Sequence, residues 1–355
     1  MLSRERIIYT LERKEDKLDR VPIHDSVWGA TIDRWRAEGL PSGVSPADYF
    51  GYEIATFGAD TSPMFPTEVL YEDNKYIVER NSFGGVRKNL RDYSSTPEVI
   101  EWPCKTREDW EKIKVRLQPH ERRVDWVSAL RIYYRERSRG RFIMYGAAVG
   151  FDKIQNYVKT DRLLSAIMRD PEWVIDMYWT DAKLVMEMCE IMMRGGFKFD
   201  GAFLFCDLGW RNGPFFSPKT FEEQLHPVFK ELCKFFNSRG MYVFLHSCGN
   251  VKSLIPYFIE EGFDVLQPLE VKAGMDLVEL KEKYGDKISF MGGIDVRLMA
   301  LGDYRLLEEE IKRKITVAKV GGGYIYHSDH SVPKNISFTN YKKVIELVLK
   351  YGSYK

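Results

Sequence analysis

From residue 200 to the end of the chain, short apolar runs alternate with amphipathic helical stretches. This alternation is typical of strand–helix units wound around a parallel sheet, and it excludes most other folds. Ser217 and Pro218 open one of the helices, and Gly240, Gly262 and Gly321 each close another. The five apolar runs are residues 201–207, 241–248, 263–270, 287–295 and 322–329.

Three earlier segments complete a set of eight strands. Residues 20–25 and 141–147 predict two of them, and residues 54–60 supply the remaining one. We therefore expect a (β/α)8 TIM barrel in which residues 1–355 form a single domain. Within residues 68–90, turn residues at 72–74 and 84–85 predict a β-hairpin insertion near the N-terminal third, placed to lie over the barrel mouth.

The charge and hydropathy of the chain exclude several classes of partner. The 53 Lys and Arg residues nearly cancel the 52 Asp and Glu residues, so no net field attracts nucleic acid or an anionic membrane. No apolar run reaches the roughly 20 residues that cross a bilayer. The five cysteines lack the spacing of a disulfide scaffold. We expect a cytoplasmic protein with reduced thiols and, as the commonest arrangement of such enzymes, a homodimer.

Metal-ligand residue types gather where the predicted strands end. In a parallel barrel these ends meet at one mouth, which holds the active site. His246 and Cys248 lie two residues apart, so an extended chain places both side chains on one face. Glu270 and His330 follow other strands and complete a donor set suited to tetrahedral zinc. His327 is the alternative to His330, because it also follows the last strand.

Each of these residues also has a structural interpretation. His246 and Cys248 are the types that occur as a hydrogen-bonded core histidine and a small buried thiol. Asp207 and Asp295 end two further strands, where a carboxylate either acts in catalysis or caps the next segment.

The residues after the first strand predict the wall of a substrate pocket. They are His24, Asp25 and Trp28, although an aromatic side chain at position 28 is equally suited to packing. His327 joins them as a substrate-orienting group if it is not a ligand.

Across almost its whole length the chain resembles the uroporphyrinogen decarboxylase superfamily. The resemblance is carried by short motifs, which are Asp19-Arg20-Val21-Pro22, Asp207-Leu208-Gly209, Phe216-Ser217-Pro218, His246-Ser247-Cys248-Gly249-Asn250, Gly292-Gly293-Ile294-Asp295 and Gly321-Gly322-Gly323-Tyr324. The chain is most similar to the zinc-dependent methyltransferases of this superfamily, with cobalamin-independent methionine synthase as a more distant relative.

The resemblance implies a zinc enzyme that moves a methyl group between methylcobalamin on a corrinoid protein and a thiol or folate-type acceptor. The methyltransferases carry His-x-Cys with a later Cys, and the methionine synthase adds a Glu at a spacing similar to that from Cys248 to Glu270. The later Cys would fall near His330, where this chain departs from the family pattern.

The alternative function is that of the family's decarboxylases, which act on a tetrapyrrole or another carboxylic acid. These enzymes use no metal and bind their polycarboxylate substrate with arginines in a signature after the first strand. In this chain that stretch reads His24-Asp25-Ser26-Val27-Trp28-Gly29, and the next arginine is Arg34. The residues at these positions therefore favour methyl transfer over decarboxylation.

Overall fold

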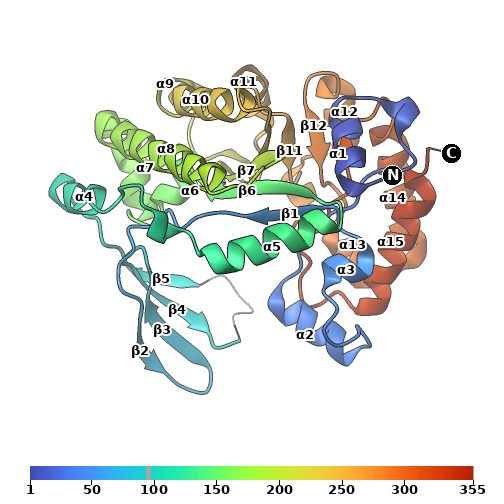
Figure 1. Cartoon of the computed structure of the whole chain (residues 1–355), viewed down its shortest axis with the longest axis horizontal. Helices are drawn as coiled ribbons and strands as arrows, with labels where there is room; N and C mark the ends of the chain where they lie inside the picture. The colour runs from blue at the N-terminus through green and yellow to red at the C-terminus, as the bar shows by residue number, and fades with distance from the viewer. Residues whose placement is uncertain (93–96, 355) are drawn as a thin grey trace.

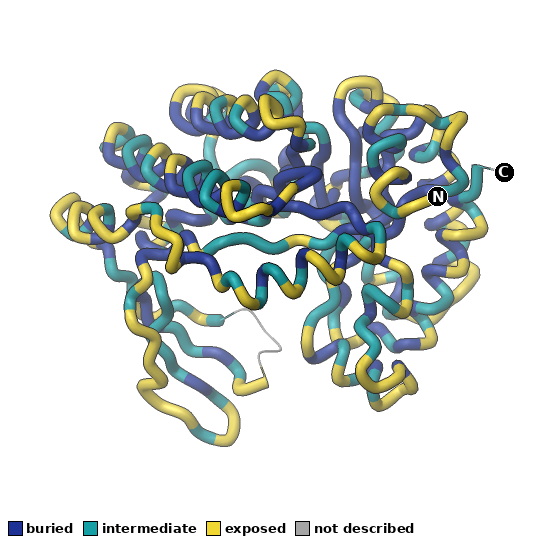
Figure 2. Tube along the Cα trace, in the orientation of Figure 1, coloured by how far each residue is buried: buried dark blue, intermediate teal, exposed yellow. Residues whose placement is uncertain are grey.

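A curled sheet of seven parallel strands forms the centre of the molecule in a computed structural model that describes residues 1–92 and 97–354 (Figure 1). Apart from β1, the strands are largely buried on both faces, which is why their sequences are almost continuously apolar (Figure 2). In sheet order they are β1 (Ile54–Phe57), β6 (Phe142–Ala148), β7 (Gly201–Phe205), β10 (Tyr242–His246), β11 (Val265–Gln267), β12 (Ser289–Met291) and β13 (Tyr324–Ile325).

Residues 22–24 close this sheet into a barrel. The backbone N–H of Tyr326 donates to the carbonyl of Pro22 at 2.9 Å, and the N–H of His24 donates back to Tyr326 at 3.0 Å. On the other side, the N–H of Glu53 donates to the carbonyl of Ile23 at 2.9 Å. This segment thus occupies the eighth position, between β13 and β1, and the predicted TIM-barrel fold is confirmed.

The lengths of the two closing strands differ from the sequence prediction. Residues 20–25 pair with the last strand segment only through a bridge between Ile23 and Tyr326, the residue after β13. The strand β13 itself covers Tyr324–Ile325 rather than residues 322–329. The weakest predicted strand, residues 54–60, is present as β1 (Ile54–Phe57). The closing segments are short because the chain leaves the sheet early to form the loops at the barrel mouth.

Two layers of apolar side chains stabilise the barrel. Inside it, alternate strand residues such as Phe142, Phe244 and Met291 pack on Ile7 and Leu11 of α1 (Ser3–Leu11), which closes one end. Outside it, the strands pack on a ring of helices whose outward faces are exposed (Figure 2). The other helices are α2 (Gly29–Ala37), α3 (Pro46–Phe50), α4 (Arg107–Lys114), α5 (Trp126–Ser138), α6 (Gly150–Ile154), α7 (Thr160–Arg169), α8 (Pro171–Arg194), α9 (Pro218–Gln224), α10 (His226–Asn237), α11 (Ile255–Glu261), α12 (Leu277–Tyr284), α13 (Val296–Leu301), α14 (Tyr304–Ala318) and α15 (Phe338–Gly352).

The predicted insertion is a four-stranded antiparallel sheet, which lies apart from the barrel strands at the lower left of Figure 1. It attaches to the segment after α6, because the rings of Phe83 and Tyr157 lie 5.5 Å apart and the indole of Trp102 donates to the carbonyl of Gln155. The predicted segment, residues 68–90, covers its first three strands, and the sequence did not predict the fourth. Its strands are β2 (Glu68–Glu72), β3 (Tyr76–Arg80), β4 (Val86–Leu90) and β5 (Glu98–Glu101).

Two smaller features complete the description. A short hairpin of β8 (Gly209–Trp210) and β9 (Gly213–Pro214) follows β7, and single 3₁₀ turns occur at η1 (Glu15–Lys17), η2 (Glu121–Arg123), η3 (Lys252–Leu254) and η4 (Val271–Ala273). Among the helices described, none combines the length and the apolar character needed to cross a bilayer.

Candidate active site

The carboxyl ends of the barrel strands surround a cavity of about 580 Å³. Its position is the one at which enzymes with this fold bind their substrates. None of its lining residues comes from the described part of the insertion, residues 68–92 and 97–101, so the described strands of the antiparallel sheet do not form its wall. The lining residues are His24, Asp25, Ser26, Thr56, Phe203, Phe205, Asp207, His246, Cys248, Gln267, Pro268, His330 and Ser331.

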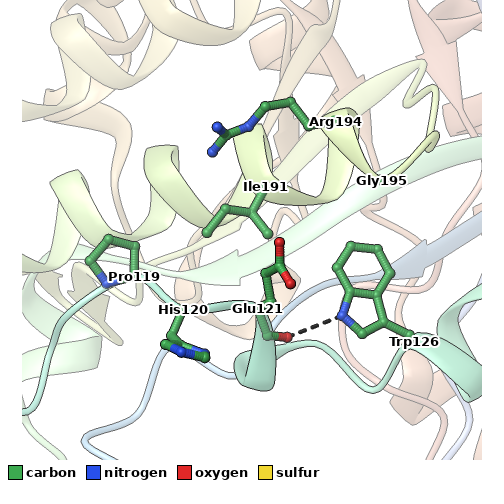
Figure 3. A pocket seen from close by; sticks show the side chains of 7 residues that line it. All are labelled: Pro119, His120, Glu121, Trp126, Ile191, Arg194 and Gly195. Atoms are coloured by element: carbon green, nitrogen blue, oxygen red, sulfur yellow. Dashed lines mark hydrogen bonds between the residues drawn. The ribbon is translucent and has the colours of Figure 1, made fainter.

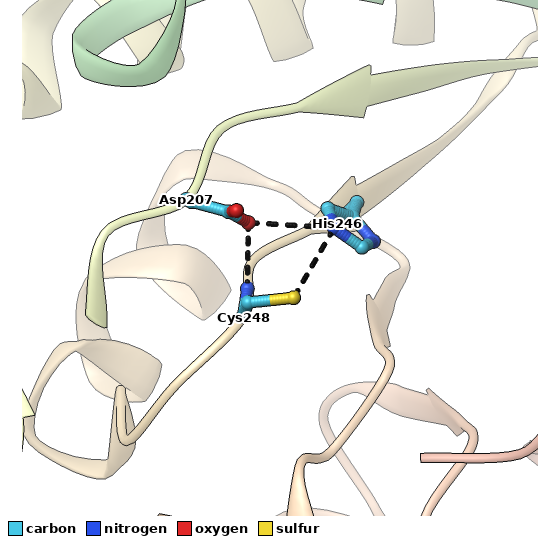
Figure 4. A group of neighbouring side chains, drawn as sticks. All are labelled: Asp207, His246 and Cys248. Atoms are coloured by element: carbon cyan, nitrogen blue, oxygen red, sulfur yellow. Dashed lines mark hydrogen bonds and ion pairs between the residues drawn. The ribbon is translucent and has the colours of Figure 1, made fainter. Parts of the chain in front are cut away.

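Three of these side chains form a group that can hold a metal ion (Figure 4). One ligand atom from each of Asp207, His246 and Cys248 lies within 4.8 Å of the others. His246 Nε2 lies 3.3 Å from Asp207 Oδ1 and 3.5 Å from Cys248 Sγ. His246 ends β10 and Cys248 follows two residues later, so both point to the same side, as their spacing predicted. Asp207 reaches them from the loop after β7.

Backbone contacts hold this group in place. The N–H of Cys248 donates to Asp207 Oδ1 at 2.8 Å, so the acid also fixes the loop that carries the thiol. Gly249 has a φ of +79°, and a Cβ there would lie 2.2 Å from the carbonyl carbon of Gly209. Only glycine allows the β8–β9 hairpin to pack this closely against the loop. The glycine after Cys248 is therefore part of the architecture of the site.

Gln267 orients the imidazole of His246. Its Oε1 makes a hydrogen bond with His246 Nδ1, which leaves Nε2 facing Asp207 and Cys248. Its Nε2 lies 3.4 Å from His327 Nε2 on the other side. The sequence did not assign a role to Gln267. A signal was present, because Gln267 is a polar residue that ends an apolar strand at the barrel mouth.

Proton affinities in the group follow from burial and from mutual contact. Burial alone would lower the pKa of His246, but hydrogen bonds to Asp207 and Cys248 raise it well above its usual value. Burial would raise the pKa of Asp207, but the contact with His246 has the larger effect, and the pKa of Asp207 lies below its usual value. Without a metal, the two residues therefore form an ion pair. Burial raises the pKa of Cys248, so its thiol keeps its proton at neutral pH.

Asp152 is a further acid near this group that the sequence did not single out. It lies in α6, directly after β6, and burial raises its pKa to about 6, with Asp207 adding to the shift. Its charge therefore changes close to neutral pH, beside the Asp207–His246 pair.

Two predicted ligands lie outside the group in the part of the chain that is described. Glu270 Oε2 accepts a hydrogen bond from the N–H of Gly249 at 2.7 Å, and its other oxygen pairs with Lys272 at 2.7 Å. His330 lines the cavity, but its ring lies beside Trp28, with 6.4 Å between the centroids, and its Nδ1 faces the carbonyl of Ser331. The structure thus brings Asp207, rather than Glu270 or His330, to the His246–Cys248 pair.

Asp295 is held at the start of a helix. Its side chain caps α13 by accepting from the N–H of Arg297 at 2.8 Å, and its carboxylate also pairs with the Arg297 guanidinium at 2.7 Å. It is not among the cavity-lining residues. This is the capping alternative that the sequence left open for a strand-end acid.

Of the predicted substrate-binding residues, His24 and Asp25 line the cavity, and His327 lies behind them in contact with both. Asp25 is buried, and His327 Nε2 lies 3.6 Å from its Oδ1. His24 packs against both Tyr52 and His327, with 5.7 Å and 6.1 Å between ring centroids, and its Nδ1 is buried without a hydrogen-bond partner in the described chain. Burial lowers the pKa of His24 to about 3, so its imidazole is neutral at physiological pH. Trp28 contacts His330 but does not line the cavity.

A second cavity, of about 510 Å³, lies on the outside of the barrel between the end of α8 and the residues around η2 (Figure 3). Its histidine, His120, accepts a hydrogen bond from the N–H of Arg122 and so caps the turn locally. The indole of Trp126 donates to the carbonyl of Glu121 across the same hollow. These contacts are structural, and the metal-ligand group lies in the barrel cavity.

Comparisons with known proteins agree with the barrel. The family model for uroporphyrinogen decarboxylase (URO-D) matches residues 85–351. Among solved structures, a methyltransferase from Methanosarcina mazei has a TM-score of 0.69 at 15% identity, and the match covers 99% of each chain. An endo-β-1,4-xylanase from Gloeophyllum trabeum has a TM-score of 0.41 at 8% identity, over 66% of this chain and 84% of its own. A search of curated protein sequences finds no match.

Proposed function

Because the chain belongs to the uroporphyrinogen decarboxylase family, we propose that it is a zinc-dependent methyltransferase. In this proposal it moves a methyl group between a corrinoid protein carrying methylcobalamin and a small thiol or folate-type acceptor. The observation that carries the proposal is the group of Asp207, His246 and Cys248 inside the barrel cavity. The fold shared with the Methanosarcina mazei methyltransferase adds support.

The donor set fits zinc. One carboxylate oxygen, one imidazole nitrogen and one thiolate sulfur are ligands that zinc accepts, and catalytic zinc sites combine three protein ligands with one open position. A zinc ion held by these residues would lower the pKa of a bound thiol and keep it as a nucleophilic thiolate. Glu270 and His330, the ligands expected from sequence, remain alternatives for a further ligand position.

The residues of this chain would prepare the reaction in four ways. Gln267 holds the His246 ring so that Nε2 faces the group. Asp207 fixes the Cys248 loop through its backbone N–H. When a metal enters, His246 and Cys248 must each give up a proton. Because the pKa of each residue is raised, metal binding should become tighter as the pH increases. The cavity walls, formed in part by Phe203 and Phe205, would exclude water from the methyl group.

Decarboxylation, the reaction in the family's name, has less support. Among the described residues that line the cavity there is no arginine or lysine, and Asp25 and Asp207 are acids. A polycarboxylate would meet these acids without a cation to bind it. The cavity thus disfavours an anionic tetrapyrrole.

Methyl exchange with free methylcobalamin tests the proposal. We expect purified protein to contain zinc and to demethylate methylcobalamin in the presence of a small thiol, with chelation abolishing the reaction and added zinc restoring it. The carbon–cobalt bond would break with its electron pair left on cobalt, while the methyl group bonds to sulfur. Release of carbon dioxide from a carboxylic acid by chelator-treated protein would contradict the proposal.

A further inference from the structure

Asp25 places a buried charge beside the cavity. Its side chain is fully buried, yet the residue lines the cavity. Its carboxylate accepts hydrogen bonds from the N–H of Ser26 and from the hydroxyls of Ser328, Tyr341 and Tyr326, at 2.9, 2.5, 2.8 and 3.3 Å. The Ser328 hydroxyl carries a single proton and also lies 2.7 Å from the carbonyl of His330. The N–H of Ser26 and the two tyrosine hydroxyls are therefore the donors committed to Asp25, and hydrogen bonds to a carboxylate favour its negatively charged form.

No fixed positive charge in the described chain pairs with Asp25. The one ion-pair partner within 4.0 Å is His327, at 3.6 Å. Burial lowers the pKa of His327, although Asp25 itself acts in the opposite direction, so this imidazole is neutral near pH 7. The hydroxyl groups around Asp25 are also neutral. A buried charge without a counter-ion is unusual, because burial in a medium of low polarity is costly unless an opposite charge lies nearby.

The other acid of the cavity is already matched. Asp207 lies 3.3 Å from His246, and with a zinc ion present the two positive charges of the metal would be balanced by Asp207 and the Cys248 thiolate. The negative charge of Asp25 is therefore left without a balancing positive charge, both in the metal-free protein and when zinc is bound. The wall of the cavity also includes the rings of Phe203 and Phe205, whose centroids lie 4.6 Å apart. Aromatic faces attract quaternary and protonated ammonium groups.

We propose that the cavity takes a small substrate that carries a positively charged nitrogen group, and that Asp25 is its counter-ion. This inference rests on the proposed function only in treating the cavity as the substrate site. It narrows that function, since it favours a substrate with an ammonium group over a folate or any other anionic acceptor.

Three probes of similar size and different charge test this proposal by calorimetry. Tetramethylammonium is the cation, tert-butanol the neutral analogue and pivalate the anion. At matched ionic strength we expect tetramethylammonium to bind about tenfold more tightly than tert-butanol, and pivalate to bind least. Equal affinities for the three probes, or tightest binding of pivalate, would overturn the proposal.

Variants identify the charge responsible. Asp25→Asn should lower the affinity for tetramethylammonium about tenfold and leave tert-butanol unchanged. The control Asp161→Asn removes an exposed acid outside the cavity and should change neither affinity. Because Asp25 is buried and Asn at that position can impair folding, Ser26→Lys provides a second route. Ser26 is exposed at the cavity edge, so a lysine there should weaken tetramethylammonium binding, whereas Ser26→Gln should not.

The outcome is independent of the methyl-transfer assay. The calorimetric measurement needs neither zinc nor methylcobalamin, so failure to bind the cation leaves the methyltransferase proposal standing. Equally, protein without zinc can still bind tetramethylammonium. If Asp25→Asn folds and retains full affinity for the cation, Asp25 is a structural acid of the barrel closure.

Discussion

At the scale of single residues, the chemistry of the site depends on Cys248. Its sulfur is the softest donor in the group, and it is held by a loop that contacts both Asp207 and the β8–β9 hairpin. The other cysteines, Cys104, Cys189, Cys206 and Cys233, are buried. Cys248 is the partly exposed thiol of the chain and the one beside a histidine.

Replacing Cys248 by Ser should lower zinc affinity on the order of 100-fold or more, because a neutral hydroxyl supplies neither the charge nor the soft donor. We expect the melting temperature of the metal-free protein to change little. Cys104→Ser, which alters a buried thiol outside the cavity, is the matched control for zinc binding. Full zinc occupancy in Cys248→Ser would assign Cys248 to the core instead.

A second pair of variants identifies the acid ligand. Asp207→Asn should lower zinc affinity by about 10- to 100-fold. Glu270→Gln should have a small effect, because an amide oxygen can still accept from the N–H of Gly249. Competition with a chromogenic chelator measures both variants. The opposite order of effects would restore Glu270 as the ligand that the sequence predicted.

The sequence predicted that His246 and Cys248 face one cavity because spacing along an extended segment determines their direction. It named Glu270 as the acid that joins them, whereas the structure brings Asp207 to the pair. Asp207 reaches the pair because its loop continues into a hairpin that packs on Gly249, whereas Glu270 is drawn to a backbone N–H of the same loop. Such contacts between different loops depend on tertiary packing, for which a single sequence carries no periodic signal.

At the scale of elements, α10 and α11 are joined by a buried acid that carries a pH dependence. His226 Nδ1 lies 2.8 Å from Glu261 Oε1. Burial raises the pKa of Glu261 to about 8, and the contact with Glu261 raises the pKa of His226. The folded pair therefore binds more protons than the unfolded chain between about pH 5 and 8. Its contribution to stability is complete below this window and is lost as pH rises through it.

We expect the free energy of unfolding of the native protein to fall, relative to that of Glu261→Gln, by on the order of 1 kcal/mol between pH 5 and 8. Urea titrations across this range measure the difference. The variant Glu260→Gln is the control, because Glu260 is an exposed neighbour with a longer contact of 3.5 Å to His226. If the free energy of unfolding changes with pH in the same way for the native protein and for Glu261→Gln, the pH dependence does not come from Glu261.

Elements were predictable where hydrophobic periodicity is strong. The barrel strands β6, β7, β10, β11 and β12 follow apolar runs that a parallel sheet buries on both faces. Only two or three residues of each segment that closes the barrel pair within the sheet. The apolar runs at these positions are longer, so the sequence predicted longer strands than the structure contains. The fourth strand of the inserted sheet, β5, is short and mostly exposed, and its sequence carries no alternation.

At the scale of the whole molecule, the site lies where a barrel concentrates the ends of its strands. A corrinoid domain, the proposed partner, must reach this cavity from the same side. Figure 1 shows the inserted sheet apart from the barrel strands. Its described residues do not line the cavity, whose walls come from the barrel strands and the loops that follow them. The cytoplasmic location and the homodimer, which is the commonest arrangement of such enzymes, remain predictions.

The most direct test is X-ray absorption at the zinc edge of native protein purified without chelators. We expect about one zinc per chain, with one sulfur neighbour at about 2.3 Å and the remaining neighbours nitrogen or oxygen at about 2.0 to 2.1 Å. The single sulfur should disappear in Cys248→Ser. A first shell without sulfur, or protein that retains no zinc, would contradict a metal centre built on His246, Cys248 and Asp207.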